Sequence, residues 1–569
     1  MPVPVSHSDR STSGAKIPRR HFDRWRLEIL PLALTGIVVV SGVGCRLLRT
    51  DGNDELPLTE TKDPSAVPVI PATVGDAARP IDHRPLSIVG VGVVHRLPGT
   101  GGAPEPSDNR EQLLEEIKRR DVPGPQAFLE QDDTAMVVVR TNVPPAARRG
   151  DRLDVLVEVP IDGGDVADLS GGWLLETRMR EQIRVRGGPL AGPSLRTGET
   201  FVIAAGRTLT EHAAGHDIED EGRKCGVVIG GGIVQEDRPL TLRLRPDHAH
   251  GLVAKSVAEA INRRLTFFDG SRRRGIAEAI DDHVVRLDVV PRYRHSVPRM
   301  LAVVARIGND PDPAAIRKRT LLAAQQINDA ETARDAALTL EAIGDNAVPA
   351  LLEALAADSP ATRFHAATSL AYLDRVESVE PLIDAIRAEP AFRAEGLLAL
   401  QTFDHVDADA GLRQLLKESS AETRCGAWAA LTAKRDADHP PHATRCDRVG
   451  DDGPPMIAVW TRKFPAVAVF GNPAPVRIPS FLRGDHGVMI RNTDGGISVS
   501  RFEAGKPDQL VDGPATVAGV VRALTQVGLD HGDIAGWLRL LKDQQAITDP
   551  LVFDAAPDPR LRYEETDDA

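Results

Sequence analysis

Apolar and polar positions along residues 136–177 predict a β-meander. Residues 136–141 form an apolar, β-branched run that ends before two consecutive prolines, because proline lacks the N–H group that a strand ladder needs. Over residues 153–159 apolar positions recur every second residue, which is the period of a strand with one buried face. The glycine pairs at 163–164 and 171–172 predict turns, and a further strand follows the second pair.

A second apolar run, over residues 87–94, contains Gly90 and Gly92. Glycine inside a strand indicates the close approach of another backbone or a β-bulge. The turn at 99–102 shares its glycines with phosphate-binding loops, but no Lys-Ser/Thr pair follows and no helix begins there. The pattern therefore predicts a buried strand and disfavours a nucleotide site.

Near the end of the sequence the period changes, and residues 516–542 predict two packed helices. Gly528 and Gly532 lie in the link between them, as an αα-hairpin requires. The apolar residues of each helix fall on one face. These residues are Val517, Val520, Val521 and Leu524 in the first helix, and Ile534, Trp537, Leu538 and Leu541 in the second.

Between residues 310 and 437 the pattern is a repeat of apolar helices. Four arginines, spaced 29, 30 and 31 residues apart, head similar Ala- and Leu-rich segments: Arg334, Arg363, Arg393 and Arg424. A second amphipathic segment follows each of the first three. One helix pair cannot bury both of its apolar stripes, so neighbouring pairs must stack. The period and composition resemble HEAT-like repeats, which usually bind another protein along a concave face.

Outside this repeat, four stretches of sequence resemble the flagellar P-ring protein family. They are VGVGVVHRLPGTG at 89–101, NVPPAARRGDRLDV at 142–155 with LSGGWLLET at 169–177, AKSVAEAINRR at 254–264, and VVRALTQVGLDHGDIAGWL at 520–538. The resemblance covers roughly residues 86–300 and 455–545. It implies a β-rich, non-catalytic protein that forms a ring in the periplasm, around the flagellar rod and at the peptidoglycan layer.

Together these patterns predict an α+β fold, in which a β-rich P-ring-like body is split by an all-α HEAT-like solenoid insertion at 310–437. The two parts of the body would cover residues 86–309 and 438–545. An insertion is tolerated where two chain ends leave a domain close together. A linker rich in Pro, Asp, Thr and Ala is expected at 45–85, and an acidic tail at 546–569.

Residues 1–44 have the pattern of an export or membrane-anchoring segment. A basic stretch precedes the apolar run at 29–43, and Cys45 follows this run after one glycine. This resembles a lipoprotein signal, in which Cys45 becomes the acylated first residue, although such signals usually carry a larger aliphatic residue where this chain has Gly42. Two alternatives stay open, because the run could also remain as one uncleaved membrane span or be removed as an ordinary signal. Each alternative places the remaining chain in the cell envelope, on the periplasmic side.

The charge of the chain disfavours a nucleic-acid partner. It has 69 basic and 82 acidic residues and a formal net charge of −13. Phosphates would be repelled unless a local basic patch intervened. The short basic cluster at 272–274 is interpreted as a solvated turn, with a contact to an anionic envelope polymer as the alternative.

Besides Cys45 the chain has Cys225, Cys425 and Cys446. Cys425 and Cys446 are the conceivable disulfide pair in an oxidising compartment, and the alternative is that these residues are buried small hydrophobes. No C-x-x-C spacing is present, so the sequence gives no indication of a zinc site.

Four histidines are candidate metal ligands. His212 and His216 have an i, i+4 spacing that would suit a metal ion on a helix, but glycine and polar neighbours indicate a loop. His248 and His250 form another short polar cluster. We expect no metal, no cofactor and no catalytic residue.

The predicted function is that of a structural subunit of a periplasmic ring resembling the flagellar P ring, not that of an enzyme. Copies would contact one another head to tail, through sheet edges in 134–178 and the final helix pair. Trp173 and Trp537 are the large side chains of these regions, and they are either interface residues or core residues. The alternative is a lipid-anchored envelope scaffold or adaptor, which would bind a protein partner through its HEAT-like repeats and the membrane through Cys45.

Overall fold

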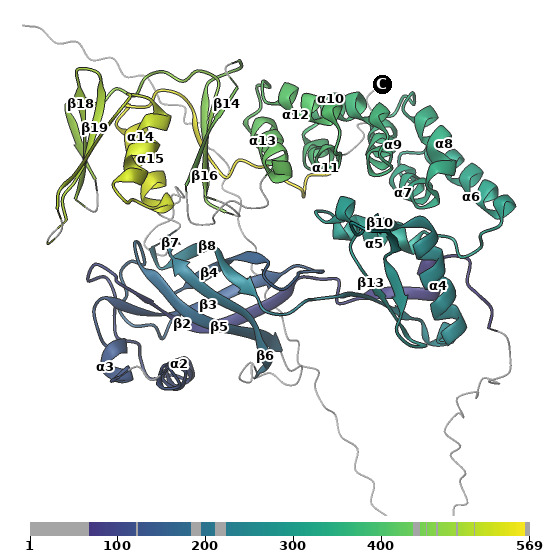
Figure 1. Cartoon of the computed structure of the whole chain (residues 1–569), viewed down its shortest axis with the longest axis horizontal. Helices are drawn as coiled ribbons and strands as arrows, with labels where there is room; N and C mark the ends of the chain where they lie inside the picture. The colour runs from purple at the N-terminus through teal and green to yellow at the C-terminus, as the bar shows by residue number, and fades with distance from the viewer. Residues whose placement is uncertain are drawn as a thin grey trace, which may run out of the picture. The chain divides into compact units, whose positions relative to one another are not determined.

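The described part of the chain contains both helices and strands, which confirms the predicted α+β fold (Figure 1). The computed structural model describes residues 68–120, 123–183, 195–210, 223–435, 444–450, 452–462, 465–484, 487–503, 505 and 507–563. The predicted export segment and Cys45 lie outside the described residues. Among the helices that are described, none is long and apolar enough to cross a membrane.

Seven strands form one antiparallel sheet that closes into a barrel. Their order is β4-β3-β2-β5-β6-β8-β7, and β4 also pairs with β8. The closing ladder runs from Arg152 opposite Ile233 to Glu158 opposite Cys225. The strands are β2 (Leu86–His95), β3 (Thr134–Val143), β4 (Arg152–Glu158), β5 (Trp173–Ile183), β6 (Leu195–Arg207), β7 (Leu209–Thr210) and β8 (Cys225–Val234).

Closure of the barrel corrects one expectation. We expected sheet edges within residues 134–178 to stay available for a partner, but β3 and β4 each have a paired strand on both sides. The alternation of apolar residues reveals that a strand has one buried face. It carries no information about which distant strand will pair with its second edge, and so the closure was missed.

Alternate residues of the barrel strands fill its interior, as the period of two predicts. Gly90 lies where β2 approaches β5, because a Cβ atom at this position would be 2.9 Å from the carbonyl oxygen of Arg178. The register between β2 and β5 also shifts between Val89 and Val94. The predicted close backbone approach is therefore confirmed. The interior cluster includes Ile88, Val137, Val139, Val155, Met179 and Val202.

Two helices that the sequence pattern did not reveal cover the other face of β2 and β3. The helix α2 (Asp108–Lys118) begins after Ser107, whose side chain accepts a hydrogen bond from the backbone N–H of Arg110. The helix α3 (Pro125–Leu129) spans little more than one turn. Their apolar residues form a separate cluster with the outward-facing residues of the two strands: Val91, Val93, Leu113, Leu114, Ile117, Leu129 and Met136.

A four-stranded sheet, in the order β1-β9-β13-β12, takes its first strand from residues predicted to be linker. The strand β1 (Ala78–Ile81) follows α1 (Val74–Ala77) and pairs with β9 (Leu240–Leu244). The predicted linker at 45–85 is therefore wrong for residues 74–81, because a strand this short is identified by its distant partner and not by its own period. The other elements are α4 (Gly251–Arg264), β10 (Thr266–Phe268), β11 (Arg273–Gly275), β12 (Ala277–Ala279), β13 (Val284–Leu287) and α5 (Val297–Ala305).

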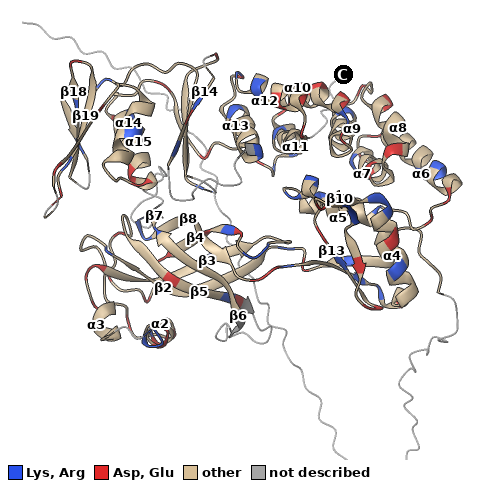
Figure 2. Ribbon diagram, in the orientation of Figure 1, with Lys and Arg blue, Asp and Glu red and all other residues tan. Residues whose placement is uncertain are grey.

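Eight α-helices occupy residues 313–435, which we call the helical segment. Within it α7, α9, α11 and α13 pack in a row, and each carries one of the four spaced arginines in its first turn. Acidic and basic side chains are interspersed over these helices (Figure 2). The helices are α6 (Pro313–Gln326), α7 (Ala333–Ile343), α8 (Val348–Ala354), α9 (Pro360–Tyr372), α10 (Val379–Ala388), α11 (Pro390–Gln401), α12 (Val406–Leu415) and α13 (Ala421–Arg435).

After the helical segment, two four-stranded sheets enclose a helix pair (Figure 1). The helices α14 (Val517–Gln526) and α15 (His531–Asp543) lie at the predicted αα-hairpin, and Gly528 in the link has a φ of 77°. One apolar cluster joins both sheets to both helices. The strands are β14 (Arg445–Val449), β15 (Met456–Trp460), β16 (Ala466–Phe470) and β21 (Leu551–Phe553) in the first sheet, and β17 (Phe481–Arg483), β18 (Val488–Thr493), β19 (Gly496–Arg501) and β20 (Gln509–Gly513) in the second.

The predicted acidic tail at 546–569 is also wrong over part of its length. Ala546 and Ile547 are buried, and β21 pairs in parallel with β15. The acidic composition of this stretch conceals a short apolar strand. Its pairing with a strand that precedes it by nearly a hundred residues could not be inferred from composition.

His531, the first residue of α15, makes the stability of this region depend on pH. Its Nε2 atom donates a hydrogen bond to the carbonyl oxygen of Trp460 at 2.6 Å, and Nδ1 lies 3.3 Å from the hydroxyl of Thr444. Burial lowers the pKa of His531 to about 4. The unfolded chain therefore binds a proton near pH 6.5, whereas the folded chain does not, and stability falls as the pH drops from about 6.5 to about 4.

We expect the variant His531→Gln to lose about 2 kcal/mol less unfolding free energy than the parent protein between pH 7 and pH 5. Glutamine cannot take up the proton, yet it can still donate to the Trp460 carbonyl. Urea unfolding followed by tryptophan fluorescence at the two pH values measures the difference. Equal losses in both proteins would show that His531 is not responsible.

Candidate functional site

Arg299 is the centre of a buried polar cluster where α5 meets the helical segment. Its guanidinium group lies 2.6 Å from a carboxylate oxygen of Glu341 on α7 and 2.8 Å from one of Glu395 on α11. The Glu341 side chain is 0% exposed, and that of Arg299 is 10% exposed. Tyr293 donates its hydroxyl proton to Glu341 over 2.7 Å. The buried carboxylate is therefore satisfied by three donor groups from two residues.

Local structure explains why these groups meet. A short 3-10 helix over residues 291–293 places Tyr293 just before α5, and α5 begins with Pro298 in its first turn. Glu341 lies in the last turn of α7, where the guanidinium of Arg264 donates to its backbone carbonyl oxygen over 2.6 Å. A cation at the carboxyl end of a helix is favoured by the helix dipole. Side chains of α4 and α5 thus hold the end of α7 in place.

The charges in the cluster follow from these contacts. Burial opposes the charge of Arg299, but Glu341 and Glu395 outweigh it and raise the pKa of the guanidinium. Burial raises the pKa of Tyr372, whose ring lies 4.5 Å from the guanidinium carbon of Arg299, to about 12. Burial also lowers the pKa of His365 to about 4. At neutral pH the arginine is therefore charged, while Tyr372 and His365 are neutral.

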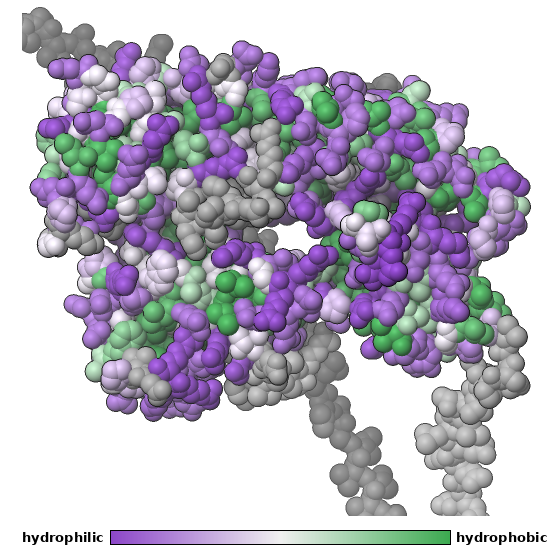
Figure 3. Space-filling model, in the orientation of Figure 1, coloured by the Kyte–Doolittle hydropathy of each residue, from purple (hydrophilic) through white to green (hydrophobic). Residues whose placement is uncertain are grey.

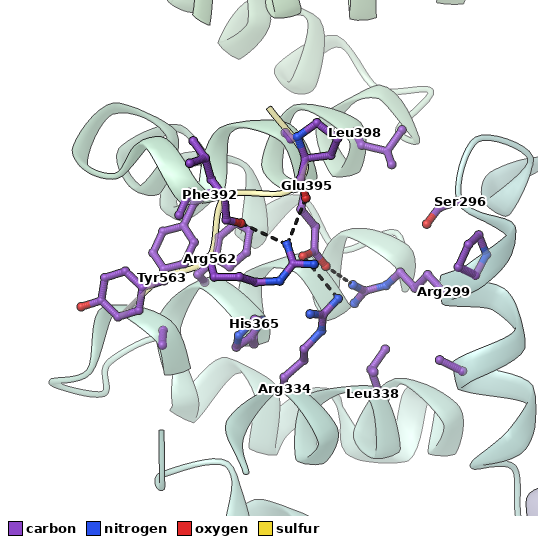
Figure 4. A pocket seen from close by; sticks show the side chains of 18 of the residues that line it. Ser296, Arg299, Arg334, Leu338, His365, Phe392, Glu395, Leu398, Arg562 and Tyr563 are labelled. Atoms are coloured by element: carbon purple, nitrogen blue, oxygen red, sulfur yellow. Dashed lines mark hydrogen bonds and ion pairs between the residues drawn. The ribbon is translucent and has the colours of Figure 1, made fainter. Parts of the chain in front are cut away.

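A pocket of about 730 Å³ opens beside this cluster (Figure 4). Its walls come from α5, α7, α9 and α11, and from residues 559–563 near the end of the chain. Arg334 of α7, His365 of α9 and Phe392 of α11 line it together with Tyr563. Because Glu331 and Glu395 also line it, the pocket combines aromatic and apolar groups with charged groups of both signs.

This arrangement suits binding and stabilisation better than catalysis. Glu395 is held by Arg299, and it also lies 3.8 Å from Arg334, so its carboxylate is engaged by two cations. The neutral His365 ring could accept a proton only well below neutral pH. Among the described residues there is no group of three or more His, Cys, Asp and Glu side chains that could hold a metal ion.

Sequence patterns did not reveal this cluster, although one signal was present. In the segment RDAALTLEAIG, Glu341 falls on the apolar stripe of the helix. A carboxylate on a buried stripe requires a partner, and this could have marked the position. The identity of the partner was not readable, because Arg299 lies on a helix that the resemblance to HEAT-like repeats does not include.

The two tryptophans proposed as interface residues lie in different environments. The Trp173 side chain, at the start of β5, is 41% exposed, and the residue pairs in register with His95 and Arg207. Trp537, on α15, is 4% exposed and packs in the core around the final helix pair. A partner could reach Trp173, but the chain itself already covers Trp537.

The structure describes several of the remaining candidate residues. Cys425 is buried, Cys446 is half-buried, and both are free thiols, so the conceivable disulfide is not formed. The side chain of His250 caps α4 by accepting a hydrogen bond from the N–H of Leu252. His212 and His216 lie outside the described residues.

Comparison with known proteins identifies the first part of the chain. The sequence model of the family described as "Flagellar P-ring protein" matches residues 74–320. Over 246 residues, the chain is 29% identical to the flagellar P-ring protein of Thermotoga maritima; this covers 41% of the chain and 66% of the relative. It is 28% identical to that of Geobacter metallireducens over 242 residues, covering 41% and 60%. For Aquifex aeolicus the identity is 26% over 234 residues, covering 39% and 58%.

The matched range begins at α1 and contains the barrel, the sheet around β9 and α5. It ends inside α6, so Arg299 lies within it and Glu341 lies beyond it. The chain spans 58–66% of the length of these relatives. The resemblance that we noted at 520–538 lies outside the matched range and stays a prediction. Residues 74–320 are therefore similar to the flagellar P-ring protein family.

Proposed function

We propose that the chain is a structural, non-catalytic subunit of a periplasmic ring that resembles the flagellar P ring around the rod. The family match over residues 74–320 carries this proposal. The matched part contains every strand of the barrel and of the small sheet around β9. In this role the subunit contacts further copies of itself, the rod and peptidoglycan, and it carries out no reaction.

Trp173 is the residue that we propose for contacts between copies. It is a large aromatic side chain, 41% exposed on a closed barrel. The surface seen in Figure 3 is largely hydrophilic, with apolar side chains in small groups. An exposed tryptophan at a barrel end is well suited to anchor an interface, because truncating such residues commonly costs the most binding energy. Ring closure then requires head-to-tail contacts between different surfaces of adjacent copies.

The test is self-association of the chain without residues 1–50, followed by sedimentation and negative-stain imaging with and without cell-wall fragments. We expect closed rings or open filaments, and we expect Trp173→Ala to weaken association by about tenfold or more. The matched control is Leu510→Ala, since Leu510 is 59% exposed on β20, outside the matched range. A chain that stays monomeric under every condition contradicts the ring.

A second candidate function is that of a lipid-anchored envelope scaffold or adaptor. The helical segment lies almost entirely outside the matched range, and it contributes most of the pocket beside Arg299. In this alternative the HEAT-like repeats bind a protein partner, and the P-ring-like region serves as a support. The test compares the envelope proteins that are pulled down by the whole chain and by its variant Arg334→Glu, which changes the pocket. Loss of a protein partner in the variant would support the adaptor. A ring that needs no such partner would assemble equally well in both.

We also propose that Cys45 is acylated and attaches the chain to the membrane. The proposal rests on the apolar run that follows a basic stretch and ends just before this cysteine. Labelled palmitate should enter the parent protein and should not enter Cys45→Ser. Equal labelling of both proteins would exclude the lipoprotein, and residues 1–44 intact on the mature chain would favour an uncleaved anchor.

A further inference from the structure

The last described residues of the chain lie along the helical segment like a bound peptide. After β21, residues 555–563 pass from α13 to α11. Ala555 packs against the apolar cluster around Trp428 of α13. A Cβ atom at Gly426 of α13 would be 2.5 Å from the Cδ1 atom of Leu397 on α11 and 3.1 Å from the Cδ atom of Pro557, so the glycine leaves room for both side chains. Residues 555–557 therefore pack closely against α13.

An aromatic contact holds the other end of these residues. The ring of Tyr563 lies 4.9 Å from that of Phe392 on α11, and the ring of Phe392 lies 4.1 Å from that of Phe364 on α9. The Phe392 and Phe364 rings are stacked, and the Tyr563 ring is tilted against that of Phe392 by 32°. Aromatic pairs in favourable stacked or tilted arrangements contribute about 0.5–1.5 kcal/mol beyond their buried area. Tyr563 is thus the natural anchor of the segment.

The polar groups of the segment bond mainly within it. Asp558 accepts from Arg560 over 3.0 Å, and Arg562 donates to the carbonyl oxygens of Pro559 and Leu561. Leu561 remains 44% exposed. The segment therefore carries its own conformation and attaches through Pro557 and Tyr563, as a short peptide ligand would.

We propose that the face of α9, α11 and α13 is a peptide-binding groove, and that residues 555–563 of a second copy of this chain occupy it when copies assemble. The structure places this sequence in the groove of its own chain. The segment lies beyond β21, and nine residues can reach about 30 Å when extended, so it can leave its own groove while β21 stays paired. Exchange with a neighbour recreates the same contacts between copies, which makes it a low-cost route to assembly.

This inference rests on the proposed ring function, because an exchange from each copy to the next gives the head-to-tail contact that a ring requires. The pocket extends from Tyr563 to Arg334 on α7, and a peptide from another copy could enter there. Two tests separate the groove from the exchange.

The first test measures the groove. A chain that ends at Asp554 should bind a labelled synthetic peptide of residues 555–563, and the full chain should bind it at least tenfold more weakly because its own segment competes. The peptide with Tyr563→Ala should lose about tenfold in affinity, since it lacks the aromatic contact with Phe392. A circular dichroism melt confirms that the shortened chain is folded. No binding by this folded chain overturns the groove.

The second test measures the exchange in the full chain. Tyr563→p-benzoylphenylalanine keeps an aromatic ring and forms a photochemical cross-link with whatever lies against it. In assembled samples we expect cross-links between copies, mapped by mass spectrometry to α9 or α11. The control position is Phe268, which is 68% exposed on β10. Rings whose cross-links lie only within single chains overturn the exchange and leave the ring function intact, whereas failure to assemble at all contradicts both.

Discussion

Leu370→Asp is expected to unfold the helical segment of residues 313–435. Leu370 is fully buried on α9, in a cluster with Leu340 of α7 and Leu351 of α8. The substitution removes a buried leucine and places an unpaired carboxylate in an apolar core. Together these changes should cost about 5 kcal/mol or more, which is comparable to the whole stability of a domain. Circular dichroism at 222 nm should show the loss of helix, and limited proteolysis should cut within residues 313–435.

The control is Leu321→Asp, because Leu321 is 66% exposed on α6 and an exposed substitution should change stability by less than about 0.5 kcal/mol. Ala366→Asp, at a fully buried position one turn before Leu370, should reproduce the large effect. If Leu370→Asp kept its helix content and its resistance to protease, the apolar face of α9 would be wrongly placed.

Arg299→Ala should lower the unfolding free energy by about 3–5 kcal/mol, because it leaves the fully buried Glu341 carboxylate without its cation. The remaining hydrogen bond from Tyr293 cannot balance a full negative charge. The measurement is urea unfolding at neutral pH, followed by circular dichroism. A shift of the transition midpoint without a change in slope would assign the effect to stability.

Arg334→Ala is the matched control, since Arg334 pairs with Glu395 at 3.8 Å and is 57% exposed. Its loss should cost less than about 1 kcal/mol. The double variant Arg299→Met with Glu341→Met should be more stable than either single change to Met, because apolar groups of similar size can replace a buried pair. If Arg299→Ala and Arg334→Ala were equally mild, the cluster would not hold α5 to α7.

The elements with a clear period were predicted well. The strand now seen as β4 carries apolar residues at every second position, β2 and β3 lie in continuous apolar runs, and α14 and α15 carry their apolar residues on one face. Strands that are defined by a distant partner were missed. β1 pairs with β9, and β21 pairs with β15, but β1 and β21 lie in stretches whose composition is typical of loops. Closure of the barrel through β4 and β8 belongs to the same class.

The sites followed the same division. Size and aromatic character selected both Trp173 and Trp537, but burial, which separates them, depends on the packing of whole domains. Glu341 could be recognised as a charge on an apolar helix stripe, whereas its partner Arg299 could not. The groove contact between Tyr563 and Phe392 joins residues far apart in the chain, and no local pattern links them.

The closed barrel limits how copies of the chain can associate without uncontrolled strand pairing. A protein that gathers many copies of itself creates a high local concentration of its own strands, and unpaired edges would then template runaway sheet growth. Because the second edge of β4 is paired with β8, strands of another copy cannot add to the sheet at this position. In the proposed ring, barrels would therefore contact one another through side chains, and a misplaced subunit could dissociate before the assembly is complete.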